Sequence, residues 1–504
     1  MNIEALSLAA VEIFTPSNIL IMTLASVLGM FVGAMPGMSS VMGLALLIPF
    51  TFKVKGYTGI MMLLSLWCSA VTGGSISATL LNTPGTANSA ATCLDGYPLA
   101  IKKQQPGRSL GISIFSSLCG GIFGCICLML GANYLAKVAL NFRSPEYFAL
   151  ALFGISILTG VSGKSVVKGF MGGLIGLLIS TVGLDPFTAV HRFTFGNLFL
   201  TGGISLIPVL IGTFAFSQAL SLIETTYNEK VEKKKFNIDH TFPSKEDRKL
   251  IRPTIIRSSI IGVLIGAIPG TGGDISSWIG YNEAKRWSKH KEDFGNGAPE
   301  GIAGSEAANN ATIGGALVPL LSLGIPGDAG AALLLATITM MGIIPGPTLF
   351  TNSPVQAYVV FVSLLVANIL MGIFGFLLIR PASKIILVPN KYIVPIIMGF
   401  CITGTYAINR SIEEVYVMLI SGIIGYLLIK LDFTMAPVTL GLVLGNLAES
   451  NARRGIDLLS SGNTIWDHPI AVVFFVLSAI SLLSPIIVQR IKKWRGASTS
   501  AKSE

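Results

Sequence analysis

Two Pro-Gly pairs recur in each half of this hydrophobic chain, and together they predict broken helices that could bind ions. The sequence Gly33-Ala-Met-Pro-Gly37 returns as Gly266-Ala-Ile-Pro-Gly270. A second pair follows each copy, Pro84-Gly85 in the first half and Pro326-Gly327 in the second. Proline removes a backbone donor and glycine allows a turn, so each pair should interrupt a helix. A helix that restarts after such a break offers free N–H groups and a positive dipole end, which can hold a carboxylate.

Small polar side chains crowd around the four breaks. Hydroxyl and amide groups in hydrocarbon need partners, so they should face other helices or a cavity. Oxygen atoms beside unwound backbone are also suitable ligands for Na⁺. Packing between helices is an equally good explanation for any single small residue. The candidate substrate-binding residues are Pro36, Gly37, Ser39, Ser40, Asn82, Thr83, Pro84, Gly85, Thr86, Pro269, Gly270, Thr271, Gly272, Asn309, Asn310, Pro326 and Gly327.

Three acidic residues near the second-half breaks are the candidate cation-coupling residues: Asp274, Glu306 and Asp328. Asn309 and Asn310 follow Glu306 at helical spacings of three and four, so the three side chains can share one face. An acid with amides beside it suits a cation site or a proton-coupled carboxylate better than an anion site. The coupling ion would be Na⁺ or H⁺. The cysteines and histidines lack metal-ligand spacing, so we expect no metal site and no cofactor.

Three other acidic residues are interpreted as structural. Asp95 and Asp185 each lie beside glycine or proline, which favours a turn or a cap. The sequence Glu449-Ser-Asn, followed by Arg453-Arg454, indicates a helix end or an interfacial loop.

The composition places these motifs in a polytopic membrane protein. The chain has 504 residues, of which 52% are hydrophobic and only 12% are charged, and its mean hydropathy is +0.72. Soluble proteins carry about 25% charged residues. A spanning helix needs about 20 apolar residues, which leaves room for about 10 to 12 membrane segments. The net charge is +10. Many of the basic residues lie in loops between apolar segments, as the positive-inside pattern expects, and no motif supports nucleic-acid binding.

The basic stretches divide the chain into two halves. We predict a first transmembrane repeat over 17–223, a basic cytoplasmic loop over 224–254, a second repeat over 255–490 and a cytoplasmic tail over 491–504. The fold class is therefore all-α, with two repeats that contain broken or re-entrant helices. Parallel and inverted arrangements are both open, and we favour the inverted one because paired broken helices are typical of it. The segment 255–281 is either a hairpin with Pro269-Gly270 at its tip or a single crossing.

Six motifs, in order, resemble the TctA family, the large membrane subunit of the tripartite tricarboxylate transporters. They extend over nearly the whole chain: Gly33-Ala-Met-Pro-Gly37, Asn82-Thr-Pro-Gly-Thr86, Asp95-Gly-Tyr-Pro98, Phe294-Gly-Asn-Gly297, Glu306-Ala-Ala-Asn-Asn-Ala311 and Leu323-Gly-Ile-Pro-Gly327.

The resemblance implies a carrier in the bacterial inner membrane that imports citrate or another carboxylate, driven by a cation gradient. It also implies two partners, a small four-helix membrane subunit (TctB-like) and a periplasmic solute-binding protein (TctC-like). The Pro-Gly loops and the segment from Glu306 to Asn310 match family motifs and so inherit a role in transport. Asp274 departs from the family, in which small neutral residues are more usual. A carboxylate there would repel an anion unless it were protonated or paired with a cation.

Two other functions, a membrane-embedded enzyme and a channel, remain as alternatives when the residues are considered without the resemblance. A membrane-embedded enzyme needs a nucleophile–base pair or a metal cluster, and none of the four histidines lies in a Pro-Gly motif. A channel can use paired broken helices as pore loops. The chain has no Walker A sequence, so an ion gradient is the expected energy source for transport.

Overall fold

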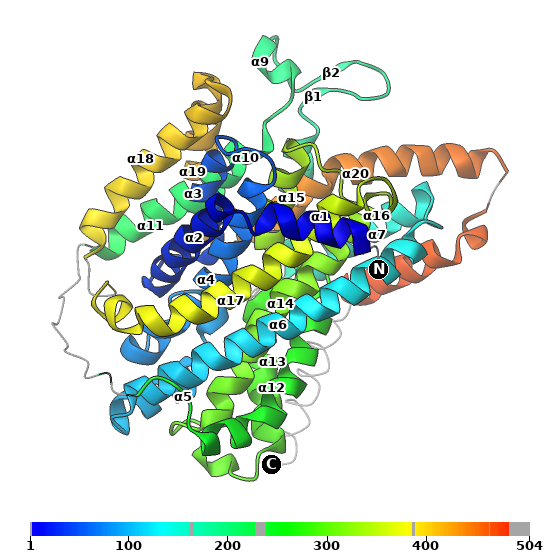
Figure 1. The fold of residues 1–504 in the computed structure, drawn as a ribbon. Coiled ribbons are helices and arrows are strands. Elements are labelled where there is room, and N and C mark those ends of the chain that lie inside the picture. The colour runs from blue at the N-terminus through cyan, green and yellow to red at the C-terminus, as the bar shows by residue number, and fades with distance from the viewer. Residues whose placement is uncertain are drawn as a thin grey trace, which may run out of the picture. The chain divides into compact units, whose positions relative to one another are not determined.

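The computed structural model describes residues 3–161, 166–226, 238, 240–385, 389–462 and 464–482, and these are nearly all helical (Figure 1). Residues 227–237 and 239 of the predicted basic loop, and the whole predicted tail over 491–504, lie outside the described residues. The chain forms two compact units. The first unit comprises Met1–Leu140 and Ile207–Tyr426, and the second comprises Asn141–Leu206 and Leu427–Glu504. Each unit takes residues from both halves of the sequence, and the predicted repeat boundaries stay a prediction.

Long apolar helices confirm the all-α polytopic class. Seven helical segments of the described residues are long and apolar enough to cross a membrane: Pro16–Ala34, Thr58–Leu81, Pro106–Ala139, Leu206–Glu224, Pro354–Lys384, Lys391–Asn409 and Ile412–Lys430. Four shorter apolar helices accompany them: Ser40–Thr51, Val167–Ser180, Ala329–Met340 and Pro469–Leu482. The segment Thr58–Leu81 is buried from Thr58 to Leu80, which places it at the centre of its unit.

The first unit contains the helices that carry all four Pro-Gly breaks. Its elements are α1 (Ile3–Ile13), α2 (Pro16–Ala34), α3 (Ser40–Thr51), α4 (Thr58–Leu81), η1 (Ala87–Ser89), α5 (Cys93–Tyr97), η2 (Pro98–Lys102), α6 (Pro106–Ala139), α10 (Leu206–Leu210), η3 (Ile211–Phe216), α11 (Ser217–Thr226), α12 (Lys245–Gly266), α13 (Gly272–Trp287), η4 (Lys291–Asp293), α14 (Pro299–Leu323), α15 (Ala329–Met340), α16 (Leu349–Asn352), α17 (Pro354–Ile385), α18 (Asn390–Asn409) and most of α19 (Ile412–Lys430).

The first Pro-Gly break separates two helices that run in opposite directions along α4. Helix α2 is parallel to α4, because Gly29 lies against Leu66 and Gly33 against Ala70. Helix α3 returns antiparallel, with Gly43 near Leu66. A Cβ on Gly33 would lie only 1.9 Å from the carbonyl oxygen of Ala70, so the close approach of the backbones requires glycine.

The second half repeats this arrangement around α14. Helix α12 is parallel to α14, because Gly262 lies against Ala308 and Gly266 against Thr312. Helix α13 is antiparallel to α14, with Gly280 against Gly304. Helices α12, α13 and α14 lie side by side in green (Figure 1). The segment 255–281 is therefore the hairpin of the two alternatives, with Pro269-Gly270 at its tip.

In each half, the glycine of the second Pro-Gly pair packs against the backbone just before the first pair. A Cβ on Gly85 would lie 2.0 Å from the carbonyl oxygen of Gly33, and one on Gly327 would lie 2.5 Å from that of Gly266. The helices before these breaks also end alike. Asn82 after α4 and Gly324 after α14 are both left-handed, with φ of 54° and 73°.

Helices α4 and α14 run in opposite directions, as their contacts with α6 show. Gly120 and Gly124 of α6 lie against Ala307 and Ala311 of α14, so these two helices are parallel. Ser113 of α6 donates to Ser75 of α4, and Ser109 donates to Gly96, which lies against Thr79. Ser109 of α6 thus lies near Thr79 of α4, and Ser113 lies near Ser75. Helices α6 and α4 are therefore antiparallel.

The second unit is a smaller group of helices with a short hairpin. It comprises α7 (Ser144–Val161), α8 (Val166–Ser180), β1 (Gly183–Leu184), β2 (His191–Arg192), α9 (Leu198–Thr201), α20 (Met435–Ser460) and η5 (Ile465–Asp467). The strands are antiparallel, and Gly183 pairs with Arg192.

Ion pairs tie this hairpin to α20. Asp185 accepts hydrogen bonds from the N–H groups of Phe187 and Thr188, which confirms its predicted role in a turn. Its carboxylate also pairs with Arg453 at 2.7 Å. The prediction that Glu449 marks a helix end was wrong, because it lies inside α20. Ion pairs with Arg192 (2.6 Å) and Arg453 (2.7 Å) compensate its charge there.

Candidate functional site

A buried asparagine without protein partners marks the place where the two halves of the sequence meet. Asn309 of α14 is 1% exposed, and neither its Nδ2 nor its Oδ1 has a hydrogen-bond partner among the described residues. An unsatisfied buried polar group costs about 1–3 kcal/mol, and a water, an ion or a ligand can supply the missing partner. The side chain lies beside Gly273 in the first turn of α13. A Cβ on Gly273 would be 2.6 Å from Oδ1 of Asn309 and 2.4 Å from Nδ2 of Asn88.

Two side-chain amides and the start of a 16-residue helix converge at Gly273, where Asn88 presents its Nδ2 and Asn309 its Oδ1. The N-terminal N–H groups and the dipole of α13 favour negative charge. The glycine has no side chain that would cover them. We name this group, formed by Asn88, Gly273 and Asn309, the amide site.

A carboxylate without an ion-pair partner lies one helical turn before Asn309. Glu306 is fully buried. Its two oxygens accept hydrogen bonds from the hydroxyls of Thr92 (2.5 Å) and Ser117 (3.0 Å). Ser305 also contacts the Thr92 hydroxyl at 3.0 Å. No basic side chain among the described residues forms an ion pair with Glu306. A charge in such a place must be neutralised by a proton or a bound cation.

Asn310 has a different role from its neighbour Asn309. Its Oδ1 accepts a hydrogen bond from the hydroxyl of Thr72 on α4 (2.9 Å), and its Nδ2 donates to the backbone carbonyl of Glu306 (3.2 Å). Asn310 thus fastens α14 to α4, whereas both polar atoms of the Asn309 side chain lack a hydrogen-bond partner in the described ranges.

Asp274 and Asp328 lie at two helix N-termini on either side of Gly272. Asp328 caps α15 by accepting from the N–H of Ala331 at 2.7 Å, and Asp274 is in the first turn of α13. A Cβ on Gly272 would lie 2.8 Å from Oδ1 of Asp274 and 3.6 Å from Cβ of Asp328. The helix dipoles stabilise both carboxylates there. No hydrogen bond joins either of them to Glu306 within the described ranges.

The loop at the first break is fastened to α11. Ser39 caps α3 by accepting from the N–H of Met42 at 3.0 Å, and its hydroxyl donates to Oε1 of Gln218 at 3.1 Å. The Nε2 of Gln218 donates to the carbonyl oxygen of Gly37 at 2.9 Å. This loop therefore has its polar groups partly satisfied by protein.

Several candidate residues are either exposed or form hydrogen bonds within and between the loops at the breaks. Asn82 and Thr83 are exposed. Thr86 is buried, and its hydroxyl is 3.3 Å from that of Ser89. Thr271 donates to the carbonyl oxygen of Ile268 at 2.9 Å and so closes the end of α12. The backbone N–H of Gly270 donates to the carbonyl oxygen of Gly327 at 2.5 Å, which joins the two second-half breaks.

Asp95 caps the N-terminus of α14, about 200 residues away in the sequence. Its Oδ1 accepts hydrogen bonds from the N–H groups of Gly295, Gly297 and Ala298 at 2.8 to 2.9 Å. Ala298 is the N-cap residue of α14, immediately before its first residue, Pro299. The predicted cap is therefore present, and it joins two of the six sequence motifs.

Sequence reasoning missed the partners that lie outside the Pro-Gly segments. Thr92, Ser117 and Gln218 were not among the candidates, although each contacts one. Ser117 carried a usable signal, since a buried serine in a long apolar helix such as α6 needs a partner. No local signal pointed to Gln218.

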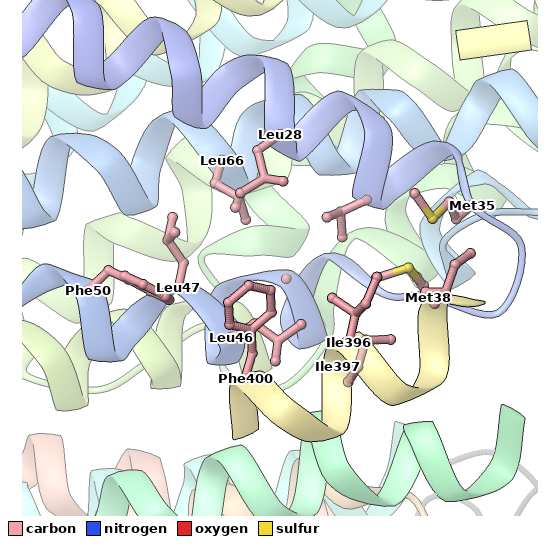
Figure 2. Close-up of a pocket in the computed structure, with 13 residues that line it drawn as sticks. Leu28, Met35, Met38, Leu46, Leu47, Phe50, Leu66, Ile396, Ile397 and Phe400 are labelled. Atoms are coloured by element: carbon pink, nitrogen blue, oxygen red, sulfur yellow. The ribbon is translucent and has the colours of Figure 1, made fainter. Parts of the chain in front are cut away.

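A separate pocket of about 420 Å³ lies between α2, α3 and α18 (Figure 2). Met35 and Met38, on either side of the first break, line one part of it, and Phe50 and Phe400 line another. All side chains that line it are apolar, so it offers no side-chain donor to a carboxylate. The amide site remains the candidate for an anionic substrate.

Comparison with known proteins agrees with the six motifs. Residues 19–440 match the family described as "Tripartite tricarboxylate transporter TctA family". An Agrobacterium vitis protein, "Uncharacterized 52.8 kDa protein in TAR-I ttuC' 3'region", is 35% identical over 97% of this chain and 98% of its own length. Another from the same organism, "Uncharacterized protein in TAR-II ttuC' 3'region", is 35% identical over 45% of this chain and 94% of its own. No solved structure matches the chain.

Proposed function

The chain belongs to the tripartite tricarboxylate transporter TctA family, and from this premise we propose that it imports citrate or another carboxylate, driven by a gradient of Na⁺ or H⁺. Family membership makes it the large membrane subunit of a transporter with several components. The substrate, the coupling ion and the particular partners are our proposal.

The observation that carries the proposal is the unsatisfied amide of Asn309 next to the start of α13. A carboxylate at the amide site accepts hydrogen bonds from Nδ2 of Asn88, from Nδ2 of Asn309 after a half-turn of its amide group, and from N–H groups at the helix start. It satisfies the buried donor without a buried lysine or arginine. Together with the helix start, these side chains supply enough donors for one carboxylate group.

Glu306 is the proposed coupling residue. Its carboxylate with the hydroxyls of Thr92 and Ser117 offers only oxygen atoms to a small cation. Such a set suits Na⁺, and the same carboxylate without Na⁺ is suited to carry a proton. Because Glu306 lies one turn from Asn309, the coupling ion and the carboxylate bind close to each other, so that each stabilises the other.

We also propose that the two halves of the sequence form inverted repeats. The contacts Gly29–Leu66, Gly33–Ala70 and Gly33–Gly85 have counterparts in Gly262–Ala308, Gly266–Thr312 and Gly266–Gly327. Helices α4 and α14, around which these contacts form, run in opposite directions. Alternating access would then move part of each repeat around the broken helices.

The remaining proposals concern the assembly. We propose a bacterial inner-membrane location and two partners, a TctB-like small membrane subunit and a TctC-like periplasmic binding protein. The many apolar helices support a multi-pass protein.

Uptake of labelled citrate into vesicles that carry the complete system tests the proposal. We expect Asn309→Ala to abolish uptake. The control is Asn133→Ala, because the amide of that partly buried residue donates to the carbonyl oxygen of Met129 in its own helix. Gradient-dependent uptake by Asn309→Ala at the wild-type rate would refute the amide site. Uptake that is independent of both gradients would favour a channel, and chemical conversion of citrate would favour an enzyme.

A further inference from the structure

We propose that the groove between α6 and α12 is a binding site for an anionic phospholipid. The groove has a volume of about 340 Å³ and is lined by Phe115, Cys119, Phe123, Arg248, Arg252, Ile255, Ile256 and Ser259. Its two arginines lie toward the start of α12 and its apolar side chains lie further along both helices. This division matches a lipid with a negatively charged headgroup and a hydrocarbon chain.

The two helices form the groove because they start together and run in the same direction. At their N-terminal ends, Arg108 of α6 and Asp247 of α12 form an ion pair at 2.6 Å. Both helices are parallel to α14, so they are parallel to each other. Phe115, Cys119 and Phe123 follow at intervals of four residues and form one stripe along α6.

The arginines at the head of the groove have no carboxylate partner. Arg248 donates to the backbone carbonyl of Ser244 (3.4 Å) and lies over the ring of Phe242. Arg252 is exposed, and it forms no hydrogen bond or ion pair with the described part of the chain. Asp247, the neighbouring acid, is engaged by Arg108. Two guanidinium groups one turn apart on a helix are well placed to bind a phosphate.

A buried polar atom marks the deep part of the groove. Ser259 is 1% exposed, and its hydroxyl has no partner among the described residues. It lies seven residues beyond Arg252, about 10 Å along the helix. A glycerol-ester oxygen or a lipid-borne hydroxyl that enters the groove can accept or donate there. The apolar side chains on either side exclude a bare phosphate ion from this depth.

The position relative to the membrane favours a lipid over a soluble anion. Helix α6 is one of the candidate spans. Helix α12 starts at Lys245, inside the stretch 224–254 that the sequence predicts to be a cytoplasmic loop, so Arg248 and Arg252 lie on the side predicted to be cytoplasmic. Basic pockets between transmembrane helices on that side bind anionic headgroups. A lipid held there would fasten the start of α12 to α6 and so support the hairpin that carries Pro269.

Native mass spectrometry of the full chain tests this site, with phosphatidylglycerol or phosphatidylcholine added in detergent. We expect roughly a 30-fold preference for phosphatidylglycerol, from two arginines near the headgroup. The double variant Arg248→Gln, Arg252→Gln should lose this preference. Lys249→Gln, which removes an exposed charge from the same turn outside the groove, should keep it.

Two further measurements separate a lipid from a phosphate ion. Cys119→Leu fills the groove without changing its charge, so it should reduce binding of phosphatidylglycerol. Inorganic phosphate alone should bind far more weakly than the lipid. The proposal is overturned by equal binding of the two lipids to the wild type, by an unchanged preference in the double variant, or by phosphate binding as tight as that of the lipid.

Discussion

The hydroxyl of Thr72 donates to Oδ1 of Asn310 at 2.9 Å and joins two helices that run in opposite directions. Both residues are fully buried. They come from opposite halves of the chain, so this bond is a direct link between the two sets of broken helices. Because Asn310 also bonds to the carbonyl of Glu306, the link reaches the candidate coupling residue.

Asn310→Ala should destabilise the protein and reduce uptake. The substitution leaves the Thr72 hydroxyl buried without its partner, which costs about 1–3 kcal/mol. Thr72→Val should cause a similar loss, and the double variant should lose less than the sum because both changes remove one bond. Thermal unfolding of the four proteins in detergent measures this. Strictly additive losses would contradict the proposed link.

Unlike Asn310→Ala, Asn309→Ala should not destabilise the protein. Its amide has no hydrogen-bond partner in the part of the chain that the structure describes, so its removal should leave the melting temperature unchanged or raise it, although uptake is lost. Comparing the melting temperatures and uptake of Asn309→Ala and Asn310→Ala therefore distinguishes a substrate-binding role for Asn309 from a structural role for Asn310. A lower melting temperature for Asn309→Ala without substrate would show that Asn309 is structural.

Gly33→Ala and Gly266→Ala should each be destabilising. The added Cβ would lie 1.9 Å from the carbonyl oxygen of Ala70 in the first case and 2.4 Å from that of Thr312 in the second. Overpacking of this kind costs about 1–3 kcal/mol. Gly399→Ala is the matched control, because nothing lies within 4 Å of its Cβ position in α18. Equal melting temperatures for the three variants would show that the helices do not approach so closely.

Glu306→Gln should uncouple transport from the ion gradient. Glutamine keeps the size of the side chain and hydrogen bonding to Thr92 and Ser117, but it carries no charge and no exchangeable acid proton. We expect gradient-driven uptake to fall to background. Glu300→Gln, a buried acid that bonds Ser288 at 2.6 Å, is the control. Normal gradient-driven uptake by Glu306→Gln would move the coupling role to Asp274 or Asp328.

The β1–β2 hairpin should loosen in acid. The N–H groups of Thr188 and Phe187, followed by Arg453, hold the pKa of Asp185 well below its ordinary value, which is about 3.9. The folded state therefore favours the ionised form. Its stabilisation is fully present above the ordinary pKa and is lost as the pH falls from there toward the lowered value. Limited proteolysis of the hairpin between pH 6 and pH 3 measures this, and Asp185→Asn should remove the pH dependence. An identical pH profile in that variant would assign the effect to another group.

The sequence by itself was enough to establish the class of protein, the family and the places where helices break. Hydrophobic length predicts spanning helices because lipid offers no partner to the backbone. Proline and glycine act on their own residues, so Pro36, Pro84, Pro269 and Pro326 locate the breaks without knowledge of the fold.

Only the tertiary structure decided which polar side chains are free and which have partners. By spacing alone, Asn309 and Asn310 are both expected on the face of Glu306. In the fold, Asn310 accepts a hydrogen bond from Thr72, whereas Asn309 has no hydrogen-bond partner among the described residues. Thr92 and Ser117 reach Glu306 from about 200 residues away in the chain. Hydrogen bonds between distant segments depend on how helices pack, and no local pattern encodes them. The sequence therefore predicted a candidate site at the helix breaks, and the packing of α4, α6, α13 and α14 determined which polar atoms this region presents.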